Sequence, residues 1–220
     1  MERLKQDYRA LLLLCALVLF IVLVPLLEGR RVGEFFLLIS IFLTLSSAAL
    51  EAGQGPRVLW RIVGLAGISM TLIVWDYGLP SRTSLVASHL MLAIFFAVIV
   101  ARLFSFLGKP GEISSGRLYI SVSLYFLLGI FWYAIFTFLN ALQPGSYAEG
   151  GVALGARTQP SKLLYFSLVT LTTLGYGDIV AVRPAARILA SLEAATGVLF
   201  VAITVARLVG GQQAASQAER

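Results

Sequence analysis

The residues with the clearest chemistry lie in one segment, Thr-Leu-Thr-Thr-Leu-Gly-Tyr-Gly-Asp, which runs from Thr170 to Asp178. Successive backbone carbonyls over Thr173 to Gly177 can all point to one side only if the backbone alternates through conformations with positive φ. Such conformations cost little for glycine, which explains the positions of Gly175 and Gly177. The segment therefore predicts a ladder of oxygen ligands, with the Thr173 hydroxyl at one end, that can replace the water around an ion.

The side chains of Leu174 and Tyr176 are expected to point away from this ladder and wedge it against a preceding helix over Ser161–Thr172. That helix is shorter than the roughly 20 residues needed to cross a membrane, so it is predicted to be re-entrant. The filter segment (Thr173–Asp178) is not helical by composition. Irregular backbone at membrane depth is tolerated where it lines a water-filled cavity, so the sequence predicts a pore or a substrate cavity.

The composition places these elements in a membrane. The chain has 220 residues, of which 59% are hydrophobic and 13% are charged, whereas soluble domains carry roughly 25% charged residues. One Cys and one His leave no material for a disulfide framework or a metal cluster, so no cofactor is expected. The net charge of +6 comes without a basic run. It predicts anchoring to membrane lipids rather than a nucleic acid partner.

Apolar stretches of spanning length set the predicted domain layout. Six stretches meet or approach that length: Ala10–Leu27, Val32–Leu50, Val58–Trp75, Ser84–Leu107, Leu118–Leu142 and Ala186–Val209. The predicted units are a four-helix domain (1–107), a linker (108–117), a pore domain (118–209) with pore helix 161–172, filter 173–178 and inner helix 186–209, and a short tail (210–220). A glycine-rich outer loop is expected over Pro144–Pro160. The basic residues favour a cell-membrane protein with both termini cytoplasmic.

The segment Thr170–Asp178 resembles the filter of the potassium channel family, whose usual form is Thr-Val-Gly-Tyr-Gly-Asp. Leu164-Tyr165-Phe166-Ser167 resembles the aromatic pair and serine of that family's pore helix. Gly197 falls where the inner helix of these channels often carries a hinge glycine. The chain is similar to prokaryotic six-span channels of the ion-transport-2 type.

This resemblance implies an all-α membrane protein with six transmembrane helices, a re-entrant pore helix and a potassium-selective pore. A closed ring needs four filter strands and one chain offers one, so the partner is predicted to be three further copies of the chain. The expected K⁺ sites lie at Thr173, Leu174, Gly175 and Tyr176, with Gly177 completing the filter. The expected supporting residues are Thr172, Asp178, Tyr165 and Phe166.

The sequence departs from the family's pattern at two positions. Leu174 replaces the commoner Val, which adds a methylene behind the filter. Val169 stands where some bacterial channels carry a Glu bonded to the filter's Asp, so Asp178 is expected to lack that partner. The usual inactivation behaviour is therefore in doubt.

The fourth span argues against voltage sensing. A sensor needs several Arg or Lys at every third position, because each charge contributes only about 2.3 kcal/mol per 100 mV. Ser84–Leu107 contains one Arg, Arg102, near its inner end and His89 near its outer end. We therefore expect a voltage-insensitive channel, with Arg102 an interfacial anchor and His89 a packing residue.

We also predict partners for charged residues in or near the other spans. Asp76 is expected to pair with Arg82. Glu193 lies mid-span and is expected to hydrogen-bond to the pore helix through Thr170 or Thr172; a proton-sensitive gate is the alternative. Below the hinge at Gly197, a ring of valines is predicted to close the inner mouth: Val201, Val205 and Val209.

Three other functions fit the sequence less well. A potassium transporter subunit would carry four filter-like segments in one long chain, with most of the tyrosines replaced. A non-selective cation channel would commonly disrupt Gly-Tyr-Gly, whereas Tyr176 is intact. A membrane enzyme would need a catalytic or metal constellation that the single His does not supply, so no enzyme is expected.

Overall fold

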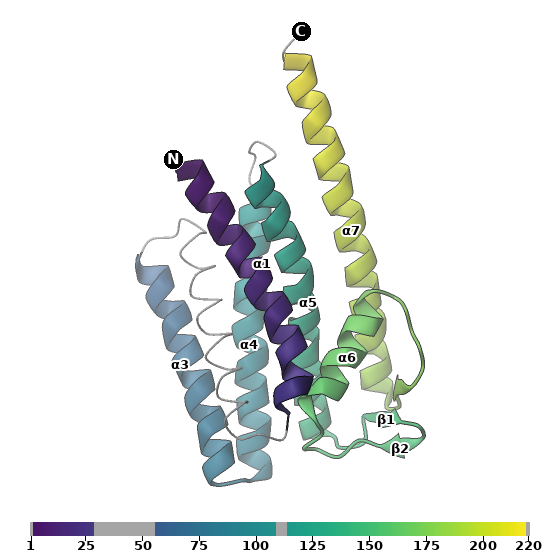
Figure 1. Cartoon of the computed structure of the whole chain (residues 1–220). Coiled ribbons are helices and arrows are strands. Elements are labelled where there is room, and N and C mark those ends of the chain that lie inside the picture. Colours follow the sequence, from purple (N-terminus) through teal and green to yellow (C-terminus); the bar gives the residue numbers. More distant parts are fainter. Residues whose placement is uncertain (1, 29–55, 109–113, 219–220) are drawn as a thin grey trace.

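The computed structural model of this chain describes residues 2–28, 56–108 and 114–218, with side chains at 7–28, 60–108 and 114–207. The described residues form the following elements: α1 (Glu2–Leu27), α3 (Pro56–Gly78), α4 (Arg82–Leu107), α5 (Ser115–Leu142), β1 (Tyr147–Glu149), β2 (Val152–Ala153), α6 (Pro160–Leu171), β3 (Ile179–Ala181) and α7 (Pro184–Ala218). The two termini lie at one end of the molecule and the strands at the other (Figure 1).

The helices follow the predicted apolar stretches. Each of α1, α3, α4, α5 and α7 begins before the stretch expected to span, because the residues that flank the stretch continue the helix. The predicted span Val32–Leu50 lies outside the described residues. Helix α7 continues through most of the predicted tail (210–220), as far as Ala218.

Four of the described helices are long and apolar enough to cross a membrane. They are Asp7–Leu27, Arg82–Leu107, Ser115–Leu142 and Pro184–Arg207. Helix α3 is not one of the four, and it contains the charged residues Arg61 and Asp76. Long apolar helices of this kind indicate a membrane protein.

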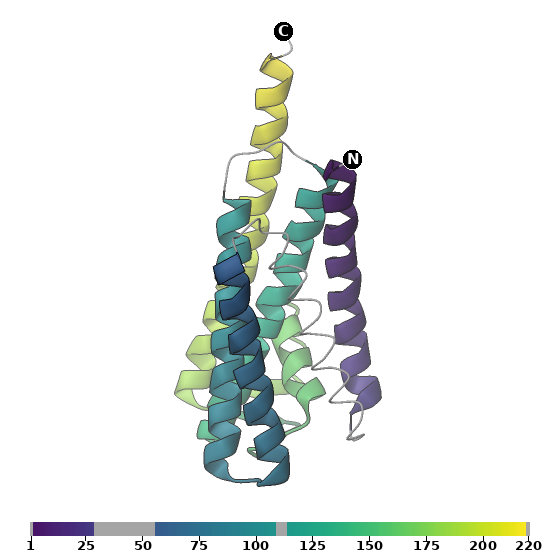
Figure 2. The same cartoon turned by 90° about the vertical axis from the view of Figure 1, so that its left-hand side faces the viewer.

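Helix α5 lies at the centre of the fold. Its most apolar window is 61% buried, against 17% for that of α7. Helices α1 and α4 pack on α5, and α3 packs on α4 (Figure 2). Helix α7 touches α5 and α6 and leaves large apolar side chains exposed, including Leu192, Val198 and Leu199.

A polar contact fastens α1 to α5 near the end that carries the termini. The Gly116 backbone N–H, in the first turn of α5, donates to Asp7 Oδ1 at 2.8 Å. Such N–H groups have no partner within their own helix, and a carboxylate suits the positive end of the helix dipole. A Cβ at position 116 would meet Asp7 Oδ1, so glycine permits this close approach.

The predicted outer loop Pro144–Pro160 contains a β-hairpin. Strand β1 pairs antiparallel with both β2 and β3, in the order β2-β1-β3. Gly150 and Gly151 form the turn between β1 and β2, with φ of 53° and 84°. A turn with two positive φ values fits a two-residue hairpin and strongly favours glycine. The hairpin was not predicted, although this Gly-Gly pair is a sequence signal for it.

Candidate functional site

The pore helix α6 begins at Pro160, one residue before the predicted start. Its N-cap residue, Gln159, makes no side-chain capping bond. The Glu28 carboxylate, just after α1, takes that place by accepting from the Ser161 hydroxyl at 2.6 Å and from the Ser161 N–H at 3.3 Å. A negative charge there is favoured by the helix dipole. This contact was not predicted, because Glu28 reads in the sequence as part of a polar connection.

The C-terminal end of α6 turns directly into the filter segment. The Thr173 N–H donates to the Thr170 carbonyl and the Leu174 N–H to the Val169 carbonyl, both at 2.9 Å. Together with the φ of 59° at Thr173, these bonds form a Schellman motif. Glycine usually occupies that position, and a β-branched residue there is strained by roughly 1–3 kcal/mol. Strained backbone conformations are common at functional sites, so the conformation of Thr173 is consistent with a functional role.

The backbone of the filter segment alternates in the sign of φ. Thr173, Gly175 and Gly177 have φ of 59°, 59° and 79°, whereas Leu174 and Tyr176 are not among the positive-φ residues. In an ordinary strand, successive carbonyls point to opposite sides. Inverting every second residue turns them to the same side. Both glycines therefore have the positive φ that the sequence predicted.

The filter segment is exposed on the single chain. Every residue from Thr172 to Asp178 is exposed, and the side chains of Leu174 and Tyr176 are 59% and 68% exposed. Their expected packing against the pore helix stays a prediction, because the described residues belong to a single chain. Within a single chain, no other segment covers the filter segment among the described residues.

The outer end of the filter segment is tied to the hairpin and to α6. Strand β3 begins right after Asp178, and the Gly150 N–H donates to the Asp178 carbonyl at 3.2 Å. The side chain of Asp178 has a hydrogen-bond partner on α6, Tyr165. A hydrogen bond from the Tyr165 hydroxyl lowers the pKa of this carboxyl. Tyr165, four residues before Val169 on α6, thus supplies the contact that the missing Glu does not.

Glu193 contacts the pore helix, but through a different residue from the two predicted. The Ser167 hydroxyl lies 2.5 Å from Glu193 Oε1, and both side chains are fully buried. Thr172 is not available, because its hydroxyl donates to the Leu168 carbonyl of its own helix at 2.7 Å. The contact through Thr170 or Thr172 is therefore wrong, and Ser167 replaces it.

Gly197 lies at a close contact between α7 and the end of α6. A Cβ at this position would overlap the Leu171 carbonyl oxygen. Because glycine has no side chain, α7 can approach the end of α6 at Gly197. This role does not depend on whether α7 bends there. Val201 and Val205 follow on α7 and are 48% and 53% exposed on the single chain. The side chain of Val209 lies outside the described residues.

Phe166 is buried in an aromatic cluster behind the pore helix. Its ring centroid lies 5.2 Å from those of Phe136 on α5 and Tyr147 on β1, and these two rings lie 5.5 Å apart. The cluster joins the pore helix, the hairpin and the central helix. Tyr147 is therefore a support residue that was not predicted from the sequence.

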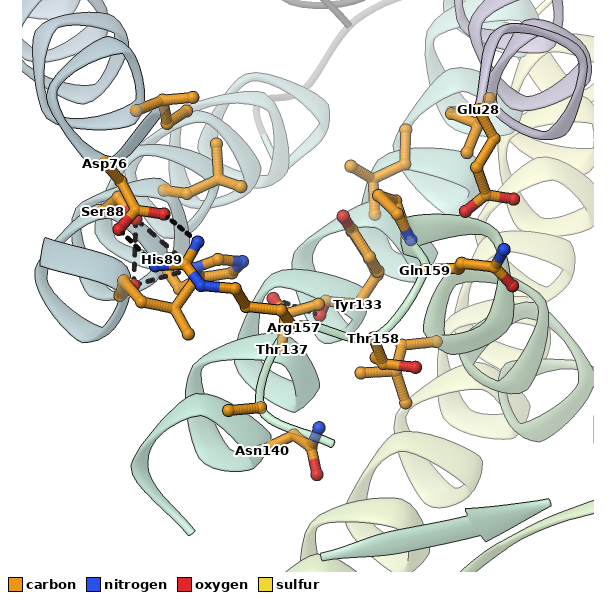
Figure 3. A pocket seen from close by; sticks show the side chains of 18 of the residues that line it. Glu28, Asp76, Ser88, His89, Tyr133, Thr137, Asn140, Arg157, Thr158 and Gln159 are labelled. Atoms are coloured by element: carbon orange, nitrogen blue, oxygen red, sulfur yellow. Dashed lines mark hydrogen bonds and ion pairs between the residues drawn. The ribbon is translucent and has the colours of Figure 1, made fainter. Parts of the chain in front are cut away.

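A cavity of about 440 Å³ lies between helices α1, α3, α4 and α5 and the loop that leads into α6. Its lining includes Asp76 and His89, and Figure 3 shows Arg157 pointing from the loop toward Asp76. The expected pair of Asp76 with Arg82 is wrong: Asp76 forms an ion pair with Arg157 at 2.6 Å, whereas Arg82 donates to the Leu142 carbonyl. His89 bonds to the Leu85 carbonyl of its own helix.

The ion pair sets the charge state of Asp76. Burial by itself would raise the pKa of this carboxyl, but hydrogen bonds from Arg157 and Ser84 and the Arg157 charge outweigh it and lower the pKa. A carboxyl with a lowered pKa stabilises the fold above its unfolded-state pKa. That stabilisation is lost as the pH falls through the lower, folded-state pKa.

Arg157→Gln is expected to reduce stability by about 1–2 kcal/mol at neutral pH, less than for a fully buried pair because the Arg157 side chain is 48% exposed. Melting of purified protein in detergent, followed from neutral to acid pH, measures this effect. The difference from wild type should shrink toward acid pH. Arg183→Gln, which removes an exposed guanidinium bonded to the Pro144 carbonyl, is the matched control. A pH-independent difference would contradict the assignment.

Comparison with known proteins finds similarity over part of the chain. Residues 118–210 match the sequence model of a family described as "Ion channel". The rat, rabbit and human proteins named "A-type voltage-gated potassium channel KCND3" are each 38% identical over 63 residues. That stretch is 29% of this chain and 10% of each relative. No solved structure matches. These matches support an ion channel.

Proposed function

We propose that four copies of this chain form a potassium-selective channel in the cell membrane, with the filter segments around one axis. The alternating φ of Thr173, Gly175 and Gly177 is the observation that carries the proposal. It turns successive carbonyls to one side, as a filter that replaces the hydration shell of K⁺ requires. The intact Gly-Tyr-Gly and the similarity to a potassium channel favour K⁺ over a non-selective pore.

The surfaces that one chain leaves uncovered support the proposed fourfold assembly. The filter segment is exposed from Thr172 to Asp178, and the apolar window of α7 is only 17% buried. Three further copies would cover the filter side chains and the free face of α7. In this proposal both termini are cytoplasmic, which agrees with their position at the end opposite the strands (Figure 1).

Ion flux into liposomes tests conduction directly. Purified protein should carry a K⁺ current down a K⁺ gradient and far less current down an equal Na⁺ gradient. Cross-linking in the same detergent should reach a four-chain product and stop there. Equal K⁺ and Na⁺ flux would support a non-selective cation channel, and a two-chain limit would contradict the fourfold ring.

The proposed channel is insensitive to voltage. Arg102→Gln is expected to leave the steepness of any conductance–voltage relation unchanged. One charge near the end of α4 crosses little of a field that contributes about 2.3 kcal/mol per charge per 100 mV. Planar-bilayer recordings at several voltages measure the steepness. A clearly shallower relation in the variant would show that α4 senses voltage.

A further inference from the structure

At the contact between the pore helix and α7, two oxygen atoms lie within hydrogen-bond distance of one serine hydroxyl. The Ser167 hydroxyl lies 2.7 Å from the Gly129 carbonyl of α5 and 2.5 Å from Glu193 Oε1. A hydroxyl has one proton to donate and lone pairs to accept with, whereas a carbonyl can only accept. If Ser167 donates to Gly129, its contact with Glu193 is a hydrogen bond only when Glu193 is the donor. A carboxyl that donates is protonated.

The surroundings of Glu193 agree with an uncharged side chain. Glu193 is fully buried, and its second oxygen, Oε2, has no hydrogen-bond partner among the described residues. A buried carboxylate with an unsatisfied oxygen is far more costly than a neutral acid in the same place. No Lys or Arg of the described residues forms an ion pair with it within 4.0 Å.

Among the described residues, the other titratable groups that interact with Glu193 are two tyrosines. Tyr125 belongs to α5 and Tyr147 to β1. Phenols carry their proton at neutral pH and supply no positive charge. Tyr125 donates to the Leu171 carbonyl at 3.3 Å, and the buried hydroxyl of Tyr147 has no partner among the described residues. Neither side chain neutralises an ionised Glu193.

Two glycines allow α5 and α7 to pack closely against α6 on either side of the Ser167–Glu193 contact. A Cβ at Gly129 would lie 2.8 Å from Leu168 Cδ2, so glycine brings the α5 backbone up to α6. On the other side, Gly197 brings α7 up to the Leu171 carbonyl. Glu193 and Gly197 are four residues apart on α7, as are Ser167 and Leu171 on α6. The Ser167–Glu193 and Leu171–Gly197 contacts therefore lie one helical turn apart along the same interface between α6 and α7, which we call the seam.

We propose that Glu193 is a buried proton-binding site, and that its proton holds α7 against the pore helix. Loss of the proton leaves Gly129 and Glu193 competing for the single hydroxyl proton of Ser167, and it places an unpaired charge in the seam. The filter segment begins two residues after Leu171, so opening of this seam disturbs the filter. Potassium flux should therefore fall as the pH rises. This coupling of the proton to flux rests on the proposed channel function.

Infrared spectroscopy of the purified protein tests the proton site without relying on conduction. The wild type at neutral pH should contain a C=O stretch of a protonated carboxyl, which Glu193→Gln removes and Glu149→Gln keeps. Glu149 is the matched control because its carboxylate forms an ion pair with Lys162 at 2.6 Å. Carbon-13 labelling of all glutamates should shift the same band in wild-type protein, without any substitution. Absence of the band, or its survival in Glu193→Gln, would overturn the proposal.

Potassium flux into liposomes tests the coupling. Wild-type flux should decline from neutral to alkaline pH, while Glu193→Gln, whose amide still donates to Ser167, should keep the neutral-pH flux throughout. An identical decline in both proteins would overturn the coupling, and so would flux from wild type that does not change with pH. If no preparation conducts K⁺, the proposed function fails, while the infrared result still decides the proton site.

Discussion

Gly177→Ala is expected to abolish potassium flux while the protein still inserts into the membrane and assembles. The φ of Gly177 is 79°, and a Cβ there meets no atom within 4 Å. The substitution is therefore disfavoured by backbone conformation alone, by about 1–2 kcal/mol in each chain. Four such penalties around one axis should turn carbonyls away from the pore. Flux into liposomes from protein of verified assembly measures the loss.

Gly151→Ala is the matched control for this prediction. Gly151 has φ of 84° and likewise has open space at its Cβ position, but it lies in the hairpin turn rather than in the filter segment. It should cost similar stability and leave flux close to wild type. Flux equal to wild type from a correctly assembled Gly177→Ala protein would contradict the filter assignment.

Gly197→Ala is expected to destabilise the protein because its methyl group would overlap the Leu171 carbonyl oxygen. This neighbour is backbone at the base of the filter segment, so it cannot turn aside as a flexible side chain could. Overpacking of this kind typically costs about 1–3 kcal/mol. Melting temperature in detergent measures the change, and flux should fall with it.

The control for Gly197 is Gly67→Ala. Gly67 lies within α3, and nothing stands within 4 Å of its Cβ position. Alanine is favoured over glycine inside a helix by about 1 kcal/mol, so this variant should be as stable as wild type or slightly more stable. If Gly197→Ala melts like wild type and changes only the open probability, the hinge interpretation is favoured over close packing.

The backbone of the site was predictable where residue type alone restricts conformation. Positive φ at Gly175 and Gly177 followed from the need to turn carbonyls to one side, and both values are found. Thr173 shares that conformation, although a threonine gives no such signal. Its conformation is imposed by the helix end, where two hydrogen bonds back to α6 close the Schellman motif.

The side-chain partners were predicted less well, because they depend on how distant segments meet. Glu193 was correctly expected to reach the pore helix, but the rotation of α6 presents Ser167 rather than Thr170 or Thr172. Asp76 was paired with Arg82 because the two are near in sequence. Its partner, Arg157, lies 81 residues away, and no local pattern relates them.

The reversal potential in planar bilayers tests the central claim most directly. With K⁺ on one side and an equal concentration of Na⁺ on the other, the wild-type current should reverse far from zero, with the K⁺ side negative, because the carbonyl ladder replaces the hydration shell of K⁺. Gly151→Ala should reverse at the same voltage. A wild-type reversal near zero under these conditions would contradict a potassium-selective filter at Thr173–Gly177.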